Sequence, residues 1–400
     1  MKKVLVPRVR FKGFSEEWKE ERFDKIFFNI QEKNKNRYSI KEYISVASNT
    51  WKKDVNIKNK QTLWNYSVFR VGDIAYEGHT NEAFPFGRFV INRIGTGIIS
   101  NIFTVFRPKA DLSLDFSQYW VNNNLVMIGL LKRSSKSGIM MNSLTLENVN
   151  EEKISLPKYF EQQKIGKLLD QISNLINLEN SKLNKLKQVK ETLLQKMFPE
   201  GNSKTPRIRF RGFNEEWSEE RFGDTIEPYR IKNYNNEKLQ SYSISNKFGF
   251  VNQKEFFENG GKAIRANKSN SLVVFPNSFA YNPARIDVGS IGLYKKEENC
   301  LVSPIYEVFK TDRKMNDEFL FNWFKIDKFK WIVNKSKEGS VRNTVYLKNI
   351  SDYLINFPSY SEQQKIGDFF SKIDTLISLY HSKLNKLKQI KYALLQKMFI

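Results

Sequence analysis

The stretch PRVRFKGFSEEWKEERF at residues 7–23 decides the fold, because it returns as PRIRFRGFNEEWSEERF at residues 206–222. A longer block, residues 161–198, returns as residues 362–399. Each half of the chain therefore holds a short repeated block, a long variable stretch and a long repeated block. A repeat of about 200 residues far exceeds the roughly 20 to 50 residues of solenoid arrays. We expect two domains with separate cores, related by a pseudo-twofold axis.

The composition indicates a globular and strongly basic chain. Of its 400 residues, 40% are hydrophobic and 14% are aromatic, which is enough for two cores. Lys and Arg number 66 against 43 Asp and Glu, and the formal charge of +23 is spread over both halves. Such an excess indicates a nucleic-acid partner. A basic, solvated surface without that role is the alternative interpretation.

The scarcity of cysteine and histidine excludes several kinds of site. Cys300 is the only cysteine, and His79 and His381 are the only histidines. A disulfide within the chain is therefore impossible, and a Cys-based or His-rich metal site is not expected. The chain also contains no run of 18 apolar residues, and the apolar stretch near its N-terminus is too short for a secretory signal. We expect a cytoplasmic protein with no membrane partner.

The long repeated block has the pattern of a helix that pairs with another helix. Residues 161–198 contain no proline, and Pro199 and Gly201 follow as a stop signal. Apolar residues recur at the 3,4 spacing of a heptad over a helix about 57 Å long. They are Leu169, Ile172, Ile176, Leu183, Leu186, Leu193 and Met197 in the first copy, and Phe370, Ile373, Ile377, Tyr380, Leu384, Leu387, Leu394 and Met398 in the second. We expect a central antiparallel coiled coil that acts as a spacer; the alternative is that each helix packs on its own domain.

The variable stretches, residues 39–160 and 241–360, contain short apolar, β-branched or aromatic runs between Gly, Asn and Pro. Such runs are typical of strands and predict an α/β or α+β domain with a curved sheet. The predicted strands include residues 43–46, 97–106, 271–275, 290–294 and 301–309.

Loops of these stretches are rich in basic and amide side chains, which are the groups that recognise base edges in DNA. A single residue of this kind is more often solvated or in contact with a phosphate than in contact with a base. The set therefore predicts which regions of the chain lie near DNA, and not which side chains contact bases. The DNA-binding candidates are Lys52, Lys53, His79, Asn81, Arg88, Arg93, Lys132, Arg133, Lys136 and Asn142 in the first stretch, and Arg265, Asn267, Lys268, Asn282, Arg285, Lys337, Arg342 and Asn343 in the second.

Familiar catalytic signatures are missing from the sequence. It has no GxxxxGK[ST] phosphate loop and no Pro-Asp dipeptide of the common nuclease motif, and Asn282-Pro283 lacks the rest of an amino-methyltransferase motif. We therefore predict a chain without catalytic, cofactor or metal residues, whose chemistry belongs to a partner. A self-contained DNA methyltransferase or nuclease with a cryptic active site is the alternative, because carboxylates can assemble from distant positions. A scaffold that binds only protein is a third possibility.

Two helices that begin P-x-x-x-E-Q-Q-K-I-G, at Pro157 and Pro358, and end LLQKMF each follow a variable domain. This arrangement resembles the specificity subunit of type I restriction-modification systems over essentially the whole chain. The resemblance implies that each variable stretch is a target recognition domain for one half of a split double-stranded DNA sequence. It also implies that the helices form the spacer and dock two modification subunits, which bind S-adenosylmethionine and methylate adenine. Restriction subunits with ATP-driven translocase and Mg²⁺-dependent nuclease activity are the further partners implied.

The repeats and the resemblance together predict four segments. They are a first target recognition domain at residues 1–156, a central helix at 157–200, a second target recognition domain at 201–357 and a C-terminal helix at 358–400. The predicted helix-pairing or subunit-docking residues are Glu161, Gln162, Gln163, Ile165, Ile172, Leu183, Leu186, Glu362, Gln363, Gln364, Ile366, Ile373, Leu384 and Leu387.

Overall fold

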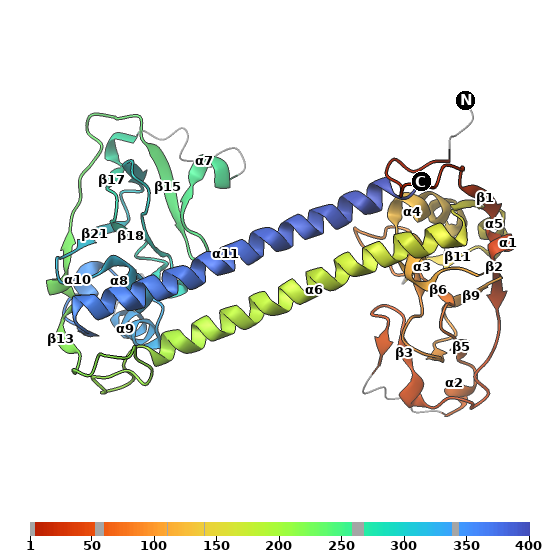
Figure 1. Cartoon of the computed structure of the whole chain (residues 1–400), viewed down its shortest axis with the longest axis horizontal. Helices are drawn as coiled ribbons and strands as arrows, with labels where there is room; N and C mark the ends of the chain where they lie inside the picture. The colour runs from red at the N-terminus through yellow and green to blue at the C-terminus, as the bar shows by residue number, and fades with distance from the viewer. Residues whose placement is uncertain (1–4, 53–59, 110, 140, 258–267, 338–343) are drawn as a thin grey trace. The chain divides into compact units, whose positions relative to one another are not determined.

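The chain folds into two compact units that share two long helices. The computed structural model describes residues 5–52, 60–109, 111–139, 141–257, 268–337 and 344–400. Unit 1 comprises residues 1–180 and 382–400, and unit 2 comprises residues 181–381. The helices α6 (Tyr159–Lys196) and α11 (Tyr360–Lys397) each give one part to each unit (Figure 1). The domain boundaries predicted above follow chain order and remain a prediction.

Unit 1 is built on a four-stranded antiparallel sheet in the order β2-β9-β6-β7. Short strands pair as β1 with β12, β3 with β4, β5 with β8, and β10 with β11. The strands are β1 (Lys19–Arg22), β2 (Phe27–Ile30), β3 (Ile44–Ser45), β4 (Thr50–Trp51), β5 (Ser67–Phe69), β6 (Ile74–Glu77), β7 (Arg88–Ile91), β8 (Gly97–Ile99), β9 (Thr104–Pro108), β10 (Ser135–Lys136), β11 (Ser143–Leu144) and β12 (Lys153–Leu156). The helices are α1 (Phe23–Ile26), α2 (Lys60–Trp64), α3 (Leu114–Trp120), α4 (Asn124–Ser134) and α5 (Leu146–Glu151).

Unit 2 repeats this topology. Its antiparallel sheet has the order β14-β21-β18-β19, and β13 pairs with β22 as β1 does with β12. A second, four-stranded sheet has the order β16-β15-β20-β17, where unit 1 has the separate two-stranded pairs β3-β4 and β5-β8. The strands are β13 (Ser218–Arg221), β14 (Ile226–Pro228), β15 (Gln240–Ser245), β16 (Gly249–Asn252), β17 (Leu272–Val274), β18 (Phe279–Tyr281), β19 (Ile291–Leu293), β20 (Cys300–Val302), β21 (Glu307–Thr311) and β22 (Leu354–Phe357). The helices are α7 (Gln253–Phe256), α8 (Asp317–Trp323), α9 (Asp327–Lys337) and α10 (Leu347–Ile350).

The predicted α+β class is confirmed, but two of the predicted strands are wrong in length. Residues 97–106 contain all of β8 and the start of β9, and residues 301–309 contain the end of β20 and the start of β21. In the first range Phe103 N–H donates to the Ser100 carbonyl at 3.2 Å, and in the second Tyr306 N–H donates to the Ser303 carbonyl at 3.1 Å. These tight turns interrupt the apolar runs, because a turn of this kind reverses the chain after only a few residues.

The two long helices pack against each other in antiparallel directions within each unit. In unit 1, Ile165 and Leu169 near the start of α6 share a buried cluster with Met398 from the end of the chain. In unit 2, Leu194 near the end of α6 shares a cluster with Ile366 near the start of α11. Both interpretations of the sequence hold in part, since each helix begins against its own domain and ends in the core of the other half.

The repeated Met-Phe ending closes each core. Phe399 stacks on Phe116 with ring centroids 5.5 Å apart and meets the edge of Trp18 at 6.3 Å. Phe198 makes the matching contact with Phe319 at 5.2 Å in unit 2. An aromatic side chain buried in this way contributes strongly to a core. The end of each helix is therefore part of the globular unit that it reaches.

Candidate nucleic-acid interface

A buried ion pair fixes the start of each long helix to its own unit. The Arg10 guanidinium donates two hydrogen bonds of 2.7 Å to the Glu161 carboxylate, and Arg209 donates two of 2.7 Å to Glu362. Both carboxylates are buried, with side-chain exposures of 1%. A bidentate Arg–carboxylate pair fixes orientation as well as charge. The two repeated blocks therefore meet in space in both units.

The glutamine after each glutamate completes this anchor. The Gln162 amide donates to the Pro157 carbonyl at 3.0 Å, and its oxygen accepts from Ser113 N–H at 3.0 Å. Gln363 donates to the Pro358 carbonyl at 3.0 Å and accepts from Asn316 N–H at 2.8 Å. These side chains satisfy backbone groups next to α3 and α8, which would otherwise be buried without a partner.

A glycine in each helix allows close approach to the domain. A Cβ on Gly166 would lie 2.5 Å from the backbone nitrogen of Phe116, and one on Gly367 would lie 2.7 Å from Cβ of Glu318. Only glycine fits at such a distance. The repeated EQQKIG motif is thus a local anchor, with its glutamate, glutamine and glycine all facing the unit.

The other predicted pairing and docking residues divide by burial. Ile165, Ile172, Leu183, Ile366, Ile373 and Leu384 are buried, Leu186 and Leu387 are half-buried, and Gln163 and Gln364 are exposed. Polar residues also lie along the helices: Lys383 pairs with the buried Glu179 at 3.0 Å, and Lys190 pairs with Asp374. Which of the exposed positions a partner contacts remains a prediction.

Several DNA-binding candidates are exposed and available to a ligand. Lys52, His79, Asn81, Lys132, Lys136 and Arg285 are exposed, whereas Lys268 is half-buried. His79 and Asn81 follow β6, and Lys132 and Lys136 lie at the end of α4 and in β10. In unit 2, Arg285 directly precedes a 3₁₀ turn at Ile286–Val288. These positions are separate neighbourhoods of loop and helix end.

Other candidates are held by partners inside the protein. Arg88 donates at 2.6 Å to Glu77 and at 2.6 Å to the Ala47 carbonyl. Arg93 donates at 2.6 Å to Asp115. An arginine held by two acceptors must break those bonds before it can contact a base. Arg88 and Arg93 therefore have a structural role in the described state.

The remaining described candidates have mixed surroundings. Arg133 pairs with Glu152 while exposing 64% of its side chain, and Lys337 pairs with Asp287 at 2.6 Å. This Lys337 hydrogen bond lowers the pKa of Asp287. Asn142 is buried, and Asn282 caps a turn by accepting from Ala284 N–H at 3.0 Å.

Five candidates lie outside the described residues. They are Lys53, Arg265, Asn267, Arg342 and Asn343.

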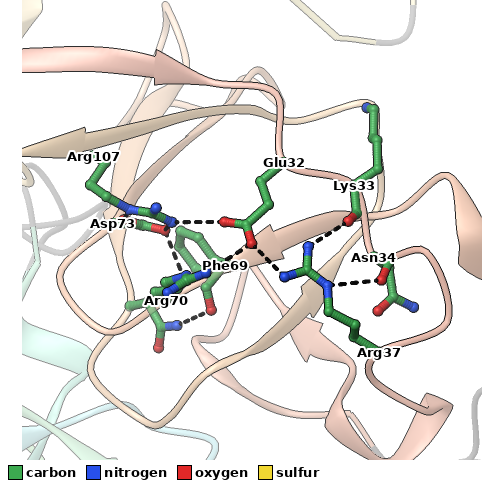
Figure 2. Close-up of polar contacts among 9 residues, drawn as sticks. Glu32, Lys33, Asn34, Arg37, Phe69, Arg70, Asp73 and Arg107 are labelled. Atoms are coloured by element: carbon green, nitrogen blue, oxygen red, sulfur yellow. Dashed lines mark hydrogen bonds and ion pairs between the residues drawn. The ribbon is translucent and has the colours of Figure 1, made fainter.

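Sequence reasoning missed a cluster of arginines in unit 1 (Figure 2). The Glu32 carboxylate lies 2.8 Å from Arg70, 2.9 Å from Arg37 and 3.5 Å from Arg107. Arg107 also donates two hydrogen bonds of 2.8 Å to Asp73. Three arginines against two carboxylates leave an excess of positive charge, with Arg37 and Arg70 about half exposed. No sequence spacing indicated this cluster, because its members lie in or next to different strands that are far apart in the sequence.

The arginines change the acidity of Glu32. The Arg70 hydrogen bond, opposed by burial, lowers the pKa of Glu32, and Arg37 acts in the same direction. An ionised carboxylate thus holds the three guanidinium groups together at neutral pH.

Unit 2 presents exposed aromatic side chains that were also missed. Phe248, Phe256 and Phe257 are exposed, with ring centroids of 6.0 Å between the first two and 5.2 Å between the last two. They lie at the β15–β16 turn and around α7, next to Lys247 and Lys254. Exposed aromatics beside cations are the combination that stacks on nucleic-acid bases.

Within the described residues, no group of three or more His, Cys, Asp or Glu side chains is placed to hold a metal ion. None of the helices described has the length and apolar character needed to cross a membrane.

Comparison with known protein families gives a match over both halves of the chain. A family model described as "Type I restriction modification DNA specificity domain" matches residues 14–188 and residues 213–389. The two matches together cover most of the sequence and coincide with its internal repeat.

Relatives of this description occur in Methanocaldococcus jannaschii. The chain is 19% identical over 337 residues to the putative type I restriction enzyme MjaX specificity subunit, which covers 80% of this chain and 76% of the relative. It is 21% identical over 268 residues to the type I restriction enzyme MjaVIII specificity subunit, covering 60% of this chain and 59% of the relative.

Solved structures share the fold at low sequence identity. A type I restriction-modification S subunit from M. genitalium superposes with a TM-score of 0.59 at 12% identity, covering 99% of both chains. A chain from a study of complex assembly and conformational transition in the type I R-M system gives 0.54 at 15% identity, covering 96% of this chain and 97% of that one. At such identities the likeness establishes the architecture alone.

Proposed function

Since this chain belongs to the type I restriction-modification DNA specificity family, we propose that its two units recognise the two unlike halves of a split DNA target. As a specificity subunit the chain is non-catalytic, binds DNA and assembles with the other subunits of the system.

The observation that carries the proposal is a repeated frame with unlike surfaces. The Arg–Glu–Gln anchor and the four-stranded sheet are the same in both units. The surfaces beyond the frame differ: unit 1 holds the Glu32 arginine cluster, and unit 2 presents Phe248, Phe256 and Phe257. Because the anchor and the sheet are shared, each unit would present its recognition surface at the same place in its fold. The different side chains on the two surfaces would then select different DNA sequences.

Exposed cations are assigned to the DNA backbone. Lys132, Lys136 and Arg285 are exposed, and Arg37 and Arg70 expose about half of their side chains. Phosphate contacts of this kind supply affinity and register without sequence information. Base selection then falls to the neighbouring amide, histidine and aromatic side chains.

The long helices set the separation between the two recognised half-sites. Both contain the heptad SKLNKLK, at residues 181–187 and at residues 382–388. Deleting this heptad from both helices shortens each by about 10 Å, or about three base pairs of DNA. We expect a spacer shorter by about that amount with unchanged half-sites, measured by mapping methylated adenines. An unchanged spacer would refute the role of the helices in spacing.

Exposed leucine pairs on the helices are assigned to docking of the modification subunits. Leu175 and Leu178 on α6 expose 47% and 49% of their surface, and Leu376 and Leu379 on α11 expose 46% and 61%. The pairs occupy equivalent positions of the two repeated blocks. Paired apolar residues on an exposed helix face are typical of a protein interface. One pair in each unit supports two modification subunits per chain, with S-adenosylmethionine on those subunits and ATP and Mg²⁺ required by the restriction subunits.

Lysine substitution tests this docking surface. The double variant Leu175→Lys with Leu178→Lys is expected to bind one modification subunit where the wild type binds two, because interface truncations of this size cost roughly 1 to 3 kcal/mol each. The control, Asn184→Lys with Gln188→Lys, adds equal charge at exposed polar positions of the same helix. Mass measurement of the purified complexes gives the stoichiometry, and loss of both subunits, or of neither, argues against the assignment.

Mapping of methylated adenines in a host that carries the chain and its partners tests the proposal as a whole. The expected result is one target with two different specified halves and an unspecified spacer between them. A continuous target, or one with two identical halves, would contradict it.

A further inference from the structure

The two units differ where the long helices meet the helix α3 or α8. In unit 1 this junction is electrically balanced: Arg93 pairs with Asp115 at 2.6 Å and lies 3.4 Å from Asp170. Lys391 is the second cation, with its ammonium 5.1 Å from the centre of the Tyr119 ring. Two cations therefore face two carboxylates.

The matching junction in unit 2 has one cation more. Lys295 pairs with Glu318 as Arg93 does with Asp115, and Lys190 pairs with Asp374. The additional cation is Lys325, two residues after α8, where unit 1 has Asn122 two residues after α3. Lys325 shares Asp374 with Lys190, at 3.8 Å, so a single carboxylate serves two ammonium groups.

This excess charge faces a pocket of about 800 Å³ within unit 2. Six lysines and two aspartates line the pocket, and one of the aspartates, Asp287, already pairs with Lys337. The walls also contain the rings of Phe248, Phe250 and Phe321. A pocket with several ammonium groups and aromatic walls is suited to an anion attached to a flat or apolar group.

The surroundings of Lys325 show that its charge is poorly compensated. Its ammonium lies 3.8 Å from the centre of the Phe321 ring, and it exposes 29% of its side chain. Burial, and next the repulsion of Lys190, lower the pKa of Lys325 to about 7, against the attraction of Asp374 and Glu318. Lys295 repels it as well. An additional anion at this position would offset both effects.

We propose that the pocket of unit 2 binds a phosphate group, and that Lys325 is the cation which this phosphate neutralises. Two sources share that chemistry: a free phosphorylated small molecule, whose flat group stacks on the phenylalanine rings, and a backbone phosphate of bound DNA. The second source rests on the proposed function, whereas the first does not. In both cases Lys325 takes up a proton when the phosphate binds above neutral pH, because the bound anion favours the charged ammonium.

Lys325→Asn places the residue of unit 1 at this position. Its effect is measured on free anions and on DNA, and the two measurements separate the sources. The control Lys372→Asn removes an equal charge from an exposed position of α11 that does not line the pocket. The conservative variant Lys325→Arg keeps the charge. All three are prepared in the full chain.

Calorimetry with inorganic pyrophosphate and with ADP tests the free source. We expect one site per chain, with a heat at pH 8 that depends on the ionisation enthalpy of the buffer. Lys325→Asn is expected to weaken binding about tenfold or more, the size of a lost charge-assisted hydrogen bond, while Lys372→Asn and Lys325→Arg leave it nearly unchanged.

The salt dependence of binding to target DNA tests the second source. If a DNA phosphate occupies the pocket, Lys325→Asn reduces the slope of log K against log salt by about one, and the methylated sequence stays the same. A change in both half-sites in this variant would instead count against the proposed division of recognition. The pocket proposal is overturned if Lys325→Asn changes neither anion affinity nor the salt slope, or if Lys372→Asn has an equal effect.

A measurement on the wild type does not depend on any variant folding. After reductive ¹³C-methylation of lysines, the NMR signal of Lys325 reports its pKa directly. The proposal requires this pKa to rise when pyrophosphate or target duplex is added, and an unchanged value with both would overturn it.

Discussion

The same position in the fold is held together by side-chain ion pairs in unit 1 and by aromatic rings in unit 2. In unit 1 the position follows β2 and contains Glu32 with Arg37, Arg70 and Arg107, together with Asp73 (Figure 2). It joins the end of β2 to β5, β6 and β9 of the same unit. Arg37 and Arg70 expose about half of their side chains, whereas Asp73 is buried.

The same position in unit 2 follows β14 and contains Tyr229. Its hydroxyl bonds to Ser278 at 2.8 Å and accepts from Phe275 N–H at 3.1 Å, and its ring lies 5.5 Å from that of Phe275. Lys310 caps the group, with its ammonium 5.2 Å from the Phe275 ring. Neutral hydrogen bonds and ring packing connect the strands at this position of unit 2, whereas ion pairs connect them in unit 1.

This difference shows which parts of the repeat are interchangeable. The Arg10–Glu161 and Arg209–Glu362 anchors are chemically identical. In contrast, the arginine cluster around Glu32, which we call the ionic lock of unit 1, and the group around Tyr229, which we call the aromatic lock of unit 2, share only their place in the fold. The same backbone frame therefore accepts different side-chain chemistry at this position, while its helix anchors stay the same.

The largest expected effect comes from breaking an anchor. Glu161→Ala leaves the Arg10 guanidinium buried without its carboxylate, and the loss of one partner of a buried pair costs about 3 to 5 kcal/mol. Glu362→Ala is expected to cost the same in unit 2. Urea unfolding of the full chain gives the change in the free energy of unfolding.

The exposed Glu17 supplies the control for the anchor variants. Glu17→Ala is expected to change the free energy of unfolding by less than about 0.5 kcal/mol. If Glu161→Ala and Glu17→Ala have the same effect, the anchor is not what holds the helix.

The ionic lock of unit 1 is expected to be sensitive to acid. Glu32→Gln should cost about 2 kcal/mol near pH 7, because hydrogen bonds to a charged group are lost. The folded-state pKa of Glu32 lies below its ordinary value of 4.5, so its contribution is complete above that value and is lost as pH falls through the lowered pKa. The stability difference between wild type and Glu32→Gln, measured from pH 7 to pH 3, should shrink toward zero; a constant difference would contradict the ionic account.

The aromatic lock of unit 2 is expected to respond at the opposite end of the pH scale. Tyr229→Phe should cost about 1 kcal/mol, with no change between pH 7 and pH 3. Burial raises the pKa of Tyr229 above 10.0, so its contribution is present below that value and is lost as pH rises through the raised pKa. Unfolding midpoints up to pH 11 test this, and an acid-dependent difference would show that ionic groups also support this lock.

The smallest effect on stability is expected at an exposed pair outside both locks. Arg133→Ala removes a pair with Glu152 in which Arg133 is 64% exposed, so it should cost less than about 1 kcal/mol. If Arg133 contacts a DNA phosphate, the same variant lowers the slope of log K against log salt by about one. DNA-binding titrations at several salt concentrations provide the slope, and an unchanged slope removes Arg133 from the interface.

The helices and the repeat could be predicted because their signals are local. Heptad spacing, the absence of proline and the duplicated blocks are all visible along the chain. The EQQKIG motif is visible in the sequence, yet the contact of its Glu161 with Arg10, 151 residues away, has no local signal. The spatial meeting of the two repeated blocks thus required the structure.

The candidate interface could be predicted only as neighbourhoods. Arg88 and Arg93 have the residue type of base-contacting side chains, but Glu77 and Asp115 hold them inside the unit. Lys132 and Arg285 have the same composition signal and are exposed. Partners brought from other strands decide between the two outcomes, and a single sequence does not state which partners meet.

The most direct test of the account exchanges one variable stretch. Residues 39–156 are replaced by the matching stretch of another specificity subunit, and the methylated adenines are mapped in a host that carries the hybrid with its partner subunits. The account predicts that one half of the target changes while the other half and the spacer stay the same. A change in both halves, or in neither, would contradict the division of recognition between the two units.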